Sequence, residues 1–137
     1  LRSRRLPFKA LLPINNIPLI VHTYKRAKMS KLLDEVIICC DDKKILKVAK
    51  KYKANAILTS THHSNGTERI FEAYLKIKKK YDFIVDIYGD EPLISPTHID
   101  KVIDFHIKNP ISPLEVFQSP DSRKLGILLK SIKLKSI

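Results

Sequence analysis

Hydrophobic and polar positions follow two different periods along this chain. Residues 35–40 (EVIICC) form a continuous apolar run, rich in β-branched residues, with the length of a buried strand. Residues 55–59 and 83–88 are further apolar runs bounded by polar residues. Between the runs at 35–40 and 55–59, residues 42–53 place an apolar side chain at every third or fourth position. This spacing predicts an amphipathic helix between predicted strands.

Three further segments show helical spacing: 18–28, 67–80 and 97–108. Helices and strands therefore alternate, and the connections between them are short. This order is typical of a sheet of parallel strands with helices on both faces. We expect an α/β protein, a three-layer α/β/α sandwich with a mainly parallel sheet.

Polar residues suggest where the helices begin. Asp41 or Asp42 is expected to cap the helix at 42–53, and Thr67 the helix that follows it. Thr97 and Asp100 have the spacing of a capping box, with Asp in place of Glu.

The pattern changes after residue 109. Residues 109–124 carry three prolines and show no clear period, and residues 125–137 are apolar and basic. The last segment fits either one more sheet strand or an amphipathic segment on a membrane surface, and we favour the strand. We expect residues 1–110 to form the main part of one domain and residues 111–137 a separate C-terminal segment.

Composition narrows the class of protein. The 137 residues include 26 basic and 14 acidic ones, a net charge of +12, but 20 of the cations are Lys and only 6 are Arg. Because specific readers of phosphates and bases tend to use Arg, the charge is weak evidence for nucleic acid. No apolar run has the length of a membrane span. The two cysteines are adjacent and cannot form a disulfide framework, which indicates a reducing, cytoplasmic compartment.

The first candidate site is the basic loop SRRLPFKAL at 3–11. Arg4, Arg5 and Lys9 precede the first predicted helix, and loops at the carboxyl edge of such a sheet bind ligands. Arg offers a planar fork to phosphate oxygens, and Lys offers a point charge. The alternative is a solvated basic terminus, which composition alone favours.

The second candidate is the loop THHSNGTER at 61–69. Small polar residues and Gly66 precede a helix, whose free N–H groups suit an anion or the edge of a nucleobase. His62 and His63 are adjacent on an extended segment, so their rings point apart and a shared metal is not expected. The alternative is a helix-capping loop in which Glu68 and Arg69 are solvated, and the residues alone favour it.

The third candidate is IYGDEPLI at 87–94, where a predicted strand ends in Gly-Asp-Glu-Pro. A carboxylate at Asp90, after a glycine that permits close approach, suits a hard cation such as Mg²⁺ held against a ligand's phosphates. The alternative is a turn in which Asp90 accepts local N–H groups. A strand-end carboxylate opposite a basic loop favours the phosphate–metal site.

Taken in order, these segments resemble the sugar-acid cytidylyltransferases, and most closely the 3-deoxy-manno-octulosonate cytidylyltransferase (CMP-Kdo synthetase) family. That family has the patterns PARxxSxRLPxKxL, "T–HxSGTxR" and "QGDEPLI", which SRRLPFKAL, TSTHHSNGTERI and YGDEPLI match. The segments NNIPLIVHTYKRA and VIICCDDKKI match two further family patterns. The resemblance covers residues 3 to about 108 in one register.

The resemblance implies a Rossmann-like nucleotidyltransferase that activates a 3-deoxy sugar acid with CTP, releasing pyrophosphate, for lipopolysaccharide or surface polysaccharide synthesis. Arg5, Lys9 and Asp90 would be catalytic, with Mg²⁺ on Asp90, and Tyr88 would face the sugar acid. Neither nucleic acid nor a membrane would be a partner, and the intact enzyme would be a homodimer. The nucleotide-binding residues implied are Ser3, Arg5, Lys9, His63, Ser64, Asn65, Gly66, Thr67 and Arg69.

Departures from the family patterns keep alternatives open. Phe8 stands where Gly is usual, Asn65 where Ser is usual, and Tyr88 replaces a Gln. The last change leaves room for a related 3-deoxy or amino sugar acid, or for a sialic-acid-like nonulosonate. We expect the family's first strand and its second half to lie outside this chain. Two further alternatives are a basic nucleic-acid-binding domain and a non-catalytic, nucleotide-binding remnant that is inactive alone.

Overall fold

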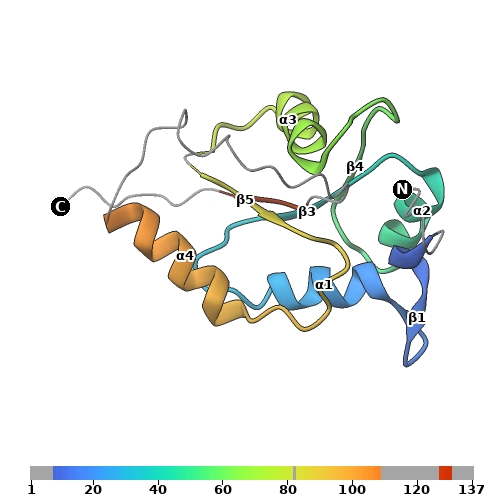
Figure 1. The fold of residues 1–137 in the computed structure, drawn as a ribbon, viewed down its shortest axis with the longest axis horizontal. Helices are drawn as coiled ribbons and strands as arrows, with labels where there is room; N and C mark the ends of the chain where they lie inside the picture. The colour runs from blue at the N-terminus through green and yellow to red at the C-terminus, as the bar shows by residue number, and fades with distance from the viewer. Residues whose placement is uncertain (1–7, 82, 109–126, 131–137) are drawn as a thin grey trace.

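The computed structural model describes residues 8–81, 83–108 and 127–130, and the side chains of 8–81 and 83–105. One mixed sheet forms its centre, with strands β3 (Val36–Cys40), β4 (Ala56–Leu58), β5 (Ile84–Ile87) and β6 (Ile127–Lys130). Helices lie on both faces of this sheet (Figure 1). The predicted α/β class and sandwich are confirmed.

The strand order is β4-β3-β6-β5. β3 and β4 pair in parallel, whereas β6 pairs antiparallel with both of its neighbours, with Ile127 opposite both Ile38 and Ile87. The three predicted strands therefore run in one direction, and β6 runs against them. The apolar segment after residue 125 is a sheet strand over Ile127–Lys130, as favoured, but the sheet is less parallel than expected.

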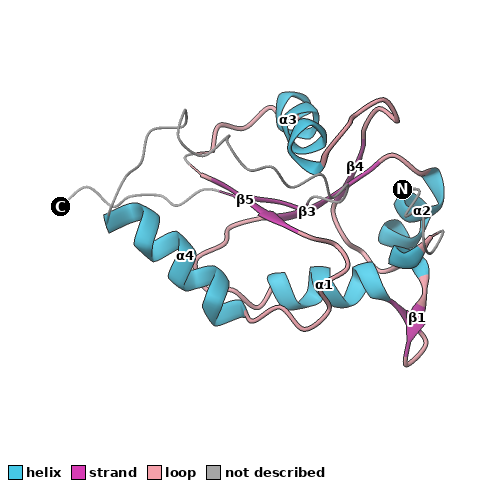
Figure 2. Cartoon of the chain, in the orientation of Figure 1, coloured by secondary structure: helices cyan, strands magenta, loops and turns pink. Residues whose placement is uncertain are grey.

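Helices α1 (Leu19–Ala27), α2 (Lys43–Lys51) and α4 (Pro96–Lys108) lie on one side of the sheet, and α3 (Gly66–Lys76) covers the other (Figure 2). All five residues of β3 are buried, because both faces of this strand are covered. Their side chains alternate between the two layers. Val36, Ile38 and Cys40 join the larger core with α1, α2 and α4. Ile37 and Cys39 join Ile70 and Ala73 of α3 in the smaller one.

Several predicted boundaries need correction. The helix at 67–80 ends at Lys76, because Ile77 turns to an extended conformation and packs against the smaller core. Phe71 on that helix is 57% exposed, whereas its neighbour Ile70 is buried. A short 3₁₀ helix, η1 (Lys9–Leu11), and a hairpin of β1 (Pro13–Ile14) and β2 (Ile17–Pro18) precede α1.

The hairpin carries a turn signal that the apolar pattern does not contain. Its two loop residues, Asn15 and Asn16, both have positive φ angles, 47° and 62°. This geometry is that of a type I′ turn, in which Asn is favoured. His22 on α1 shares a hydrogen bond of 2.9 Å with the carbonyl of Ile14 and so holds the hairpin against the helix.

Asp100 does not belong to a capping box. Its carboxylate accepts the backbone N–H groups of Lys31 and Leu32 and the hydroxyl of Ser30, all in the connection between α1 and β3. Burial acts to raise the pKa of Asp100, but these hydrogen bonds outweigh it and the pKa is lowered. Asp100 therefore joins α4 to another part of the fold instead of starting its own helix.

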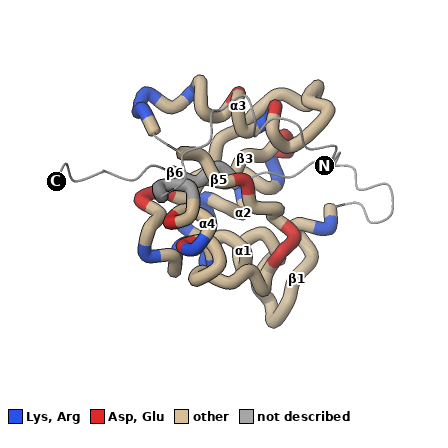
Figure 3. Tube along the Cα trace, turned by 60° about the vertical axis from the view of Figure 1, so that its left-hand side comes forward, with Lys and Arg blue, Asp and Glu red and all other residues tan. Residues whose placement is uncertain are grey.

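Charge is dispersed over the molecule. Lys and Arg positions are spread around the described trace and interspersed with acidic ones (Figure 3). Within the described part of the chain, no helix is both long and apolar enough to cross a membrane.

Candidate functional site

The carboxyl ends of β3, β4 and β5 lie at one edge of the sheet, toward the right of Figure 1. Asp41 follows β3, Thr59 follows β4, and Asp90 lies three residues after β5. η1 and the start of α2 lie at the same edge. Loops that are far apart in sequence therefore lie at the same edge of the sheet, the edge at which open α/β sheets bind ligands.

Lys9 and Asp90 are in direct contact. The Lys9 Nζ lies 2.8 Å from Oδ2 of Asp90, and the two side chains are 43% and 33% exposed. Gly89 next to Asp90 is held by the buried hydroxyl of Thr23, which donates to its carbonyl at 3.0 Å. The first and third predicted segments are thus joined by an ion pair of residues 81 positions apart.

The residue before Lys9 has an unusual backbone conformation. Phe8 precedes η1 with φ 59° and ψ 25°, in the left-handed region, and its ring lies 4.5 Å from the Lys44 ammonium at the start of α2. The left-handed conformation costs little for Gly and about 1–2 kcal/mol for other residues. This explains why the family pattern has Gly where this chain has Phe8.

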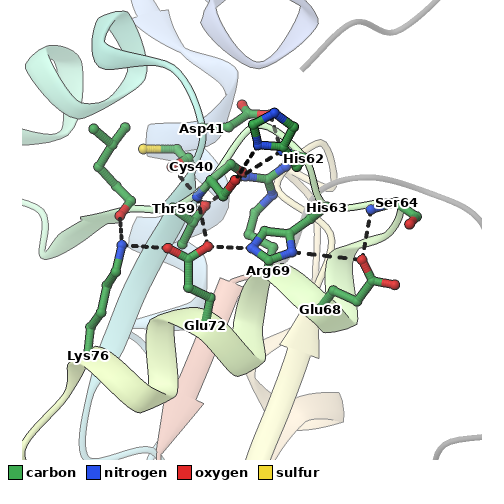
Figure 4. Close-up of polar contacts among 12 residues, drawn as sticks. Cys40, Asp41, Thr59, His62, His63, Ser64, Glu68, Arg69, Glu72 and Lys76 are labelled. Atoms are coloured by element: carbon green, nitrogen blue, oxygen red, sulfur yellow. Dashed lines mark hydrogen bonds and ion pairs between the residues drawn. The ribbon is translucent and has the colours of Figure 1, made fainter.

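Arg69 is a buried clamp on the second predicted segment (Figure 4). Its Nη2 donates to Asp41 Oδ2 at 2.9 Å, and its Nη1 donates to the Thr59 hydroxyl at 2.7 Å and the Ser60 carbonyl at 3.2 Å. The residue is 1% exposed. α3 is thereby fixed to the ends of both β3 and β4. The expected nucleotide contact of Arg69 would require some of these bonds to be exchanged.

The Arg69 side chain is not fully satisfied. Its Nε is buried without a hydrogen-bond partner among the described residues. The ion pair with Asp41 is also well buried, with side-chain exposures of 2% and 10%. In such a place an unpaired charge is costly, so the two residues depend on each other.

Glu72, one turn after Arg69, holds the loop that follows β4 (Figure 4). It accepts the backbone N–H of Ser60 at 2.7 Å and pairs with Nε2 of His63 and with Nζ of Lys76 at 2.5 Å. The hydrogen bond from Lys76 and the one from Ser60 lower the pKa of Glu72 to about 2. His62 points elsewhere, toward the hydroxyl of Ser60 at 3.0 Å, so the two histidines diverge as predicted.

Asn65, not Thr67, caps α3. The Asn65 side chain accepts the N–H of Glu68 at 2.9 Å, and Glu68 accepts the Ser64 N–H at 2.8 Å and the Asn65 amide at 3.0 Å. The Ser64 N–H is the main cause of the lowered pKa of Glu68. The predicted cap at Thr67 is wrong because Thr67 lies inside the helix and is exposed.

The other predicted site residues have varied positions. Ser3 and Arg5 lie outside the described residues. Gly66 is buried at the first position of α3, and Ser64 is exposed beside it. Tyr88 is half-buried just after β5, and its carbonyl accepts the N–H of Glu91 at 3.1 Å.

The residues that sequence analysis missed are the acidic partners. Asp41 and Asp42 are both candidate caps for α2 in the sequence, but Asp42 alone caps it, accepting the Lys44 N–H at 2.6 Å. Asp41 is left to pair with Arg69. The sequence contains a signal for this role, since one helix end needs only one of two adjacent carboxylates. Glu72 gives no such signal.

Two other features do not join the polar contacts of this site. Cys40 ends β3, and burial raises the pKa of its thiol to about 11, which fits the buried strand predicted at 35–40 and argues against a thiolate nucleophile. A pocket of about 420 Å³ opens at the opposite edge, beside Glu35, Asn55 and Tyr81. Tyr81 donates to Glu35 at 2.7 Å, and burial followed by this bond raises the pKa of Tyr81.

Known proteins share the sequence family and the fold of this chain. A family model described as "Cytidylyltransferase" matches residues 1–123, so the chain belongs to that family. A solved structure of CMP:2-keto-3-deoxy-manno-octonic acid synthetase complexed with CTP has the same fold, with a TM-score of 0.70, 23% identity, and coverage of 90% of this chain and 65% of that one.

Several individual proteins are similar to this chain in sequence. A 3-deoxy-manno-octulosonate cytidylyltransferase of a Nitratiruptor species is 44% identical over 111 residues, 80% of this chain and 45% of the relative. A mitochondrial protein of the same name from Arabidopsis thaliana is 43% identical over 101 residues, 74% of this chain and 35% of the relative. An 8-amino-3,8-dideoxy-manno-octulosonate cytidylyltransferase of a Shewanella species is 36% identical over 109 residues, covering 79% and 44%. The chain spans less than half the length of these curated relatives.

Proposed function

We propose that this chain is the nucleotide-binding part of a cytidylyltransferase that couples CTP to a 3-deoxy sugar acid. In that reaction the anomeric hydroxyl oxygen of the sugar acid bonds to the α-phosphorus of CTP. The bond from that phosphorus to the oxygen bridging the α- and β-phosphates breaks, pyrophosphate leaves, and the hydroxyl proton passes to solvent. No covalent enzyme intermediate is needed, so catalysis consists of positioning and charge neutralisation.

The observation that carries this proposal is the 2.8 Å ion pair of Lys9 and Asp90 at the carboxyl edge of the sheet. It joins the first and third candidate segments. The second candidate segment, at 61–69, is fixed to the same edge through Arg69 and Asp41. Lys9 is proposed to bind the triphosphate, together with Ser3 and Arg5.

The donor set suits Mg²⁺ held jointly with a nucleotide. Asp90 supplies a carboxylate oxygen that solvent reaches, and carboxylates are preferred ligands of this hard cation. Among the described residues no group of three or more potential ligands exists that would hold a metal alone. Mg²⁺ commonly takes one or two carboxylates and completes its shell with substrate phosphates and water. When bound, it would neutralise charge on the triphosphate.

The second substrate is proposed from the relatives' names. Both 3-deoxy-manno-octulosonate and its 8-amino-8-deoxy analogue are substrates in those names, and Tyr88 lies at the position that faces the sugar acid in the resemblance. The homodimeric state, a cytoplasmic location and a role in lipopolysaccharide synthesis belong to the same proposal for the whole protein.

A graft tests the proposed activity. Residues 8–108 would replace the corresponding segment of the Nitratiruptor relative, and pyrophosphate release would be measured with CTP and each of the two sugar acids. We expect CTP-dependent release with at least one of them, and none with ATP or GTP in place of CTP. A folded graft that shows no CTP preference would contradict the proposal.

In the same graft, Asp90→Asn is expected to lower kcat by about 10²–10³-fold or more, because the neutral amide fits the same space but is a poor ligand for a hard dication. Glu91→Gln, which changes an exposed neighbour by the same chemistry, is the matched control and should retain most of the rate. Near-normal turnover in Asp90→Asn would remove the metal role from this residue.

A further inference from the structure

The contact between Lys9 and Asp90 links the two roles that the proposed function assigns to them separately. Under that function, Lys9 binds phosphate and Asp90 binds the metal ion. In the structure they instead neutralise each other, with 2.8 Å between Nζ and Oδ2. Among the described residues, neither of the two side chains makes a second ion pair.

We propose, resting on the proposed function, that Lys9 is a latch on Asp90. The Lys9 ammonium occupies the carboxylate until the triphosphate draws it away, so that a divalent cation binds Asp90 weakly before the nucleotide and more tightly with it. A monovalent ammonium and a dication at the same carboxylate repel each other. Because binding free energies are reciprocal, the metal ion strengthens nucleotide binding by the same factor.

The fold allows one partner to move and holds the other in place. Asp90 follows Gly89, which is buried and bonded to Thr23 on α1, and the turn from Tyr88 to Glu91 closes on a 3.1 Å backbone hydrogen bond. Lys9 has a flexible four-carbon side chain that is 43% exposed. The ammonium can therefore swing toward a phosphate while the carboxylate stays where it is.

The size of the effect follows from the exposure of the pair. Exposed ion pairs are weak, and measured couplings between sites usually start at about fivefold. We expect removal of the Lys9 charge to tighten nucleotide-free binding of a divalent cation by about 3- to 10-fold.

The test measures Mn²⁺ binding to the 137-residue chain without nucleotide, by water-proton relaxation, with circular dichroism as a check on folding. Lys9→Met removes the latch, and Lys9→Arg keeps a cation that can pair with Asp90. Lys101→Met, on the exposed surface of α4, controls for the loss of one positive charge. Asp90→Asn removes the proposed ligand.

We expect Lys9→Met to bind Mn²⁺ about 3- to 10-fold more tightly than the unchanged chain. Lys9→Arg and Lys101→Met should stay within about twofold of it, and Asp90→Asn should lose the site. Equal affinity in Lys9→Met and the unchanged chain, or no detectable binding by either, overturns the latch. If Asp90→Asn binds as well as the unchanged chain, the metal role in the proposed function also fails, so the two failures are distinguishable.

Discussion

At the scale of single residues, the departure of Phe8 from the family pattern has a cost in folding stability that can be measured. Its φ of 59° lies in the left-handed region, which is unfavourable for any residue that has a Cβ atom. We expect Phe8→Gly to have a free energy of unfolding about 1 kcal/mol higher than that of Phe8→Leu, by urea unfolding. Both variants lose the contact with Lys44, so this contact cancels in the comparison. Equal stabilities would show that the left-handed conformation is not maintained in solution.

The residue type of Arg69 suggests that it binds a ligand, whereas its buried position supports a structural role. An arginine in a polar loop suggests a phosphate ligand, yet here the guanidinium is buried and bonded to protein groups. Its identity as a nucleotide contact stays a prediction. Its structural role is independent of any ligand.

We expect Arg69→Met to lower the free energy of unfolding by about 3 kcal/mol, because the Asp41 carboxylate loses its ion pair with Arg69 in a largely buried place. The double variant Arg69→Met with Asp41→Asn should lose clearly less than the sum of the two single changes. Urea unfolding of the four proteins measures this coupling. Additive losses would show that the two side chains do not depend on each other.

At the scale of elements, α3 organises the candidate site. It contributes Arg69 to the strand ends, Glu72 to the loop after β4, and the Asn65 cap at its own start. Its apolar face rests on β3 through Ile70 and Ala73. The helix is thus both a layer of the sandwich and the support of the loop that the resemblance assigns to nucleotide binding.

Acid should weaken this support. The lowered pKa of Glu72, about 2, means that its bonds contribute stability above the ordinary carboxyl pKa near 4.5 and lose it as pH falls toward 2. We expect Glu72→Gln to be less stable than the unchanged chain by about 1 kcal/mol at about pH 6, and this difference to shrink as pH falls from about 4.5 to 2. Thermal unfolding across that range measures it. Glu91→Gln is the control, and a constant difference for Glu72→Gln would contradict the assignment.

Elements were predictable where the cause is local. Continuous apolar runs predicted strands β3, β4 and β5, and apolar positions at helical spacing predicted the four α-helices of the described residues. The bounds agree to within a few residues, except for the C-terminal end of α3. Caps were predicted less well, because Asp100 and Thr67 have the right spacing but their helices begin elsewhere. What a polar side chain bonds to depends on the neighbouring element, and a single sequence does not contain that information.

At the scale of the whole molecule, order and direction in the sheet follow from long-range packing. The segment at 125–137 fits a strand, but nothing in its residues states that Ile127–Lys130 would lie between β3 and β5 and run against them. The convergence of the candidate loops was predictable for a different reason, since parallel strands of one sheet must present their carboxyl ends at one edge. The contact between Lys9 and Asp90 is the outcome of that rule in this chain.

The share of the family's length that this chain spans sets the activity we expect from it. The chain spans 45% of its Nitratiruptor relative, and the resemblance leaves the family's second half outside the matched residues. We expect the 137-residue chain to bind CTP with Mg²⁺ weakly, to prefer CTP over GTP, and to form no CMP-linked sugar acid. Isothermal titration and a pyrophosphate assay measure the two properties separately. The nucleic-acid alternative predicts the opposite pattern: the chain would bind DNA with an affinity that falls steeply as the salt concentration rises, and it would show no preference for CTP. Product formation by the chain alone would show that the second half is not needed for turnover. If the chain showed no preference for CTP over GTP, the basic nucleic-acid-binding domain would be the better interpretation.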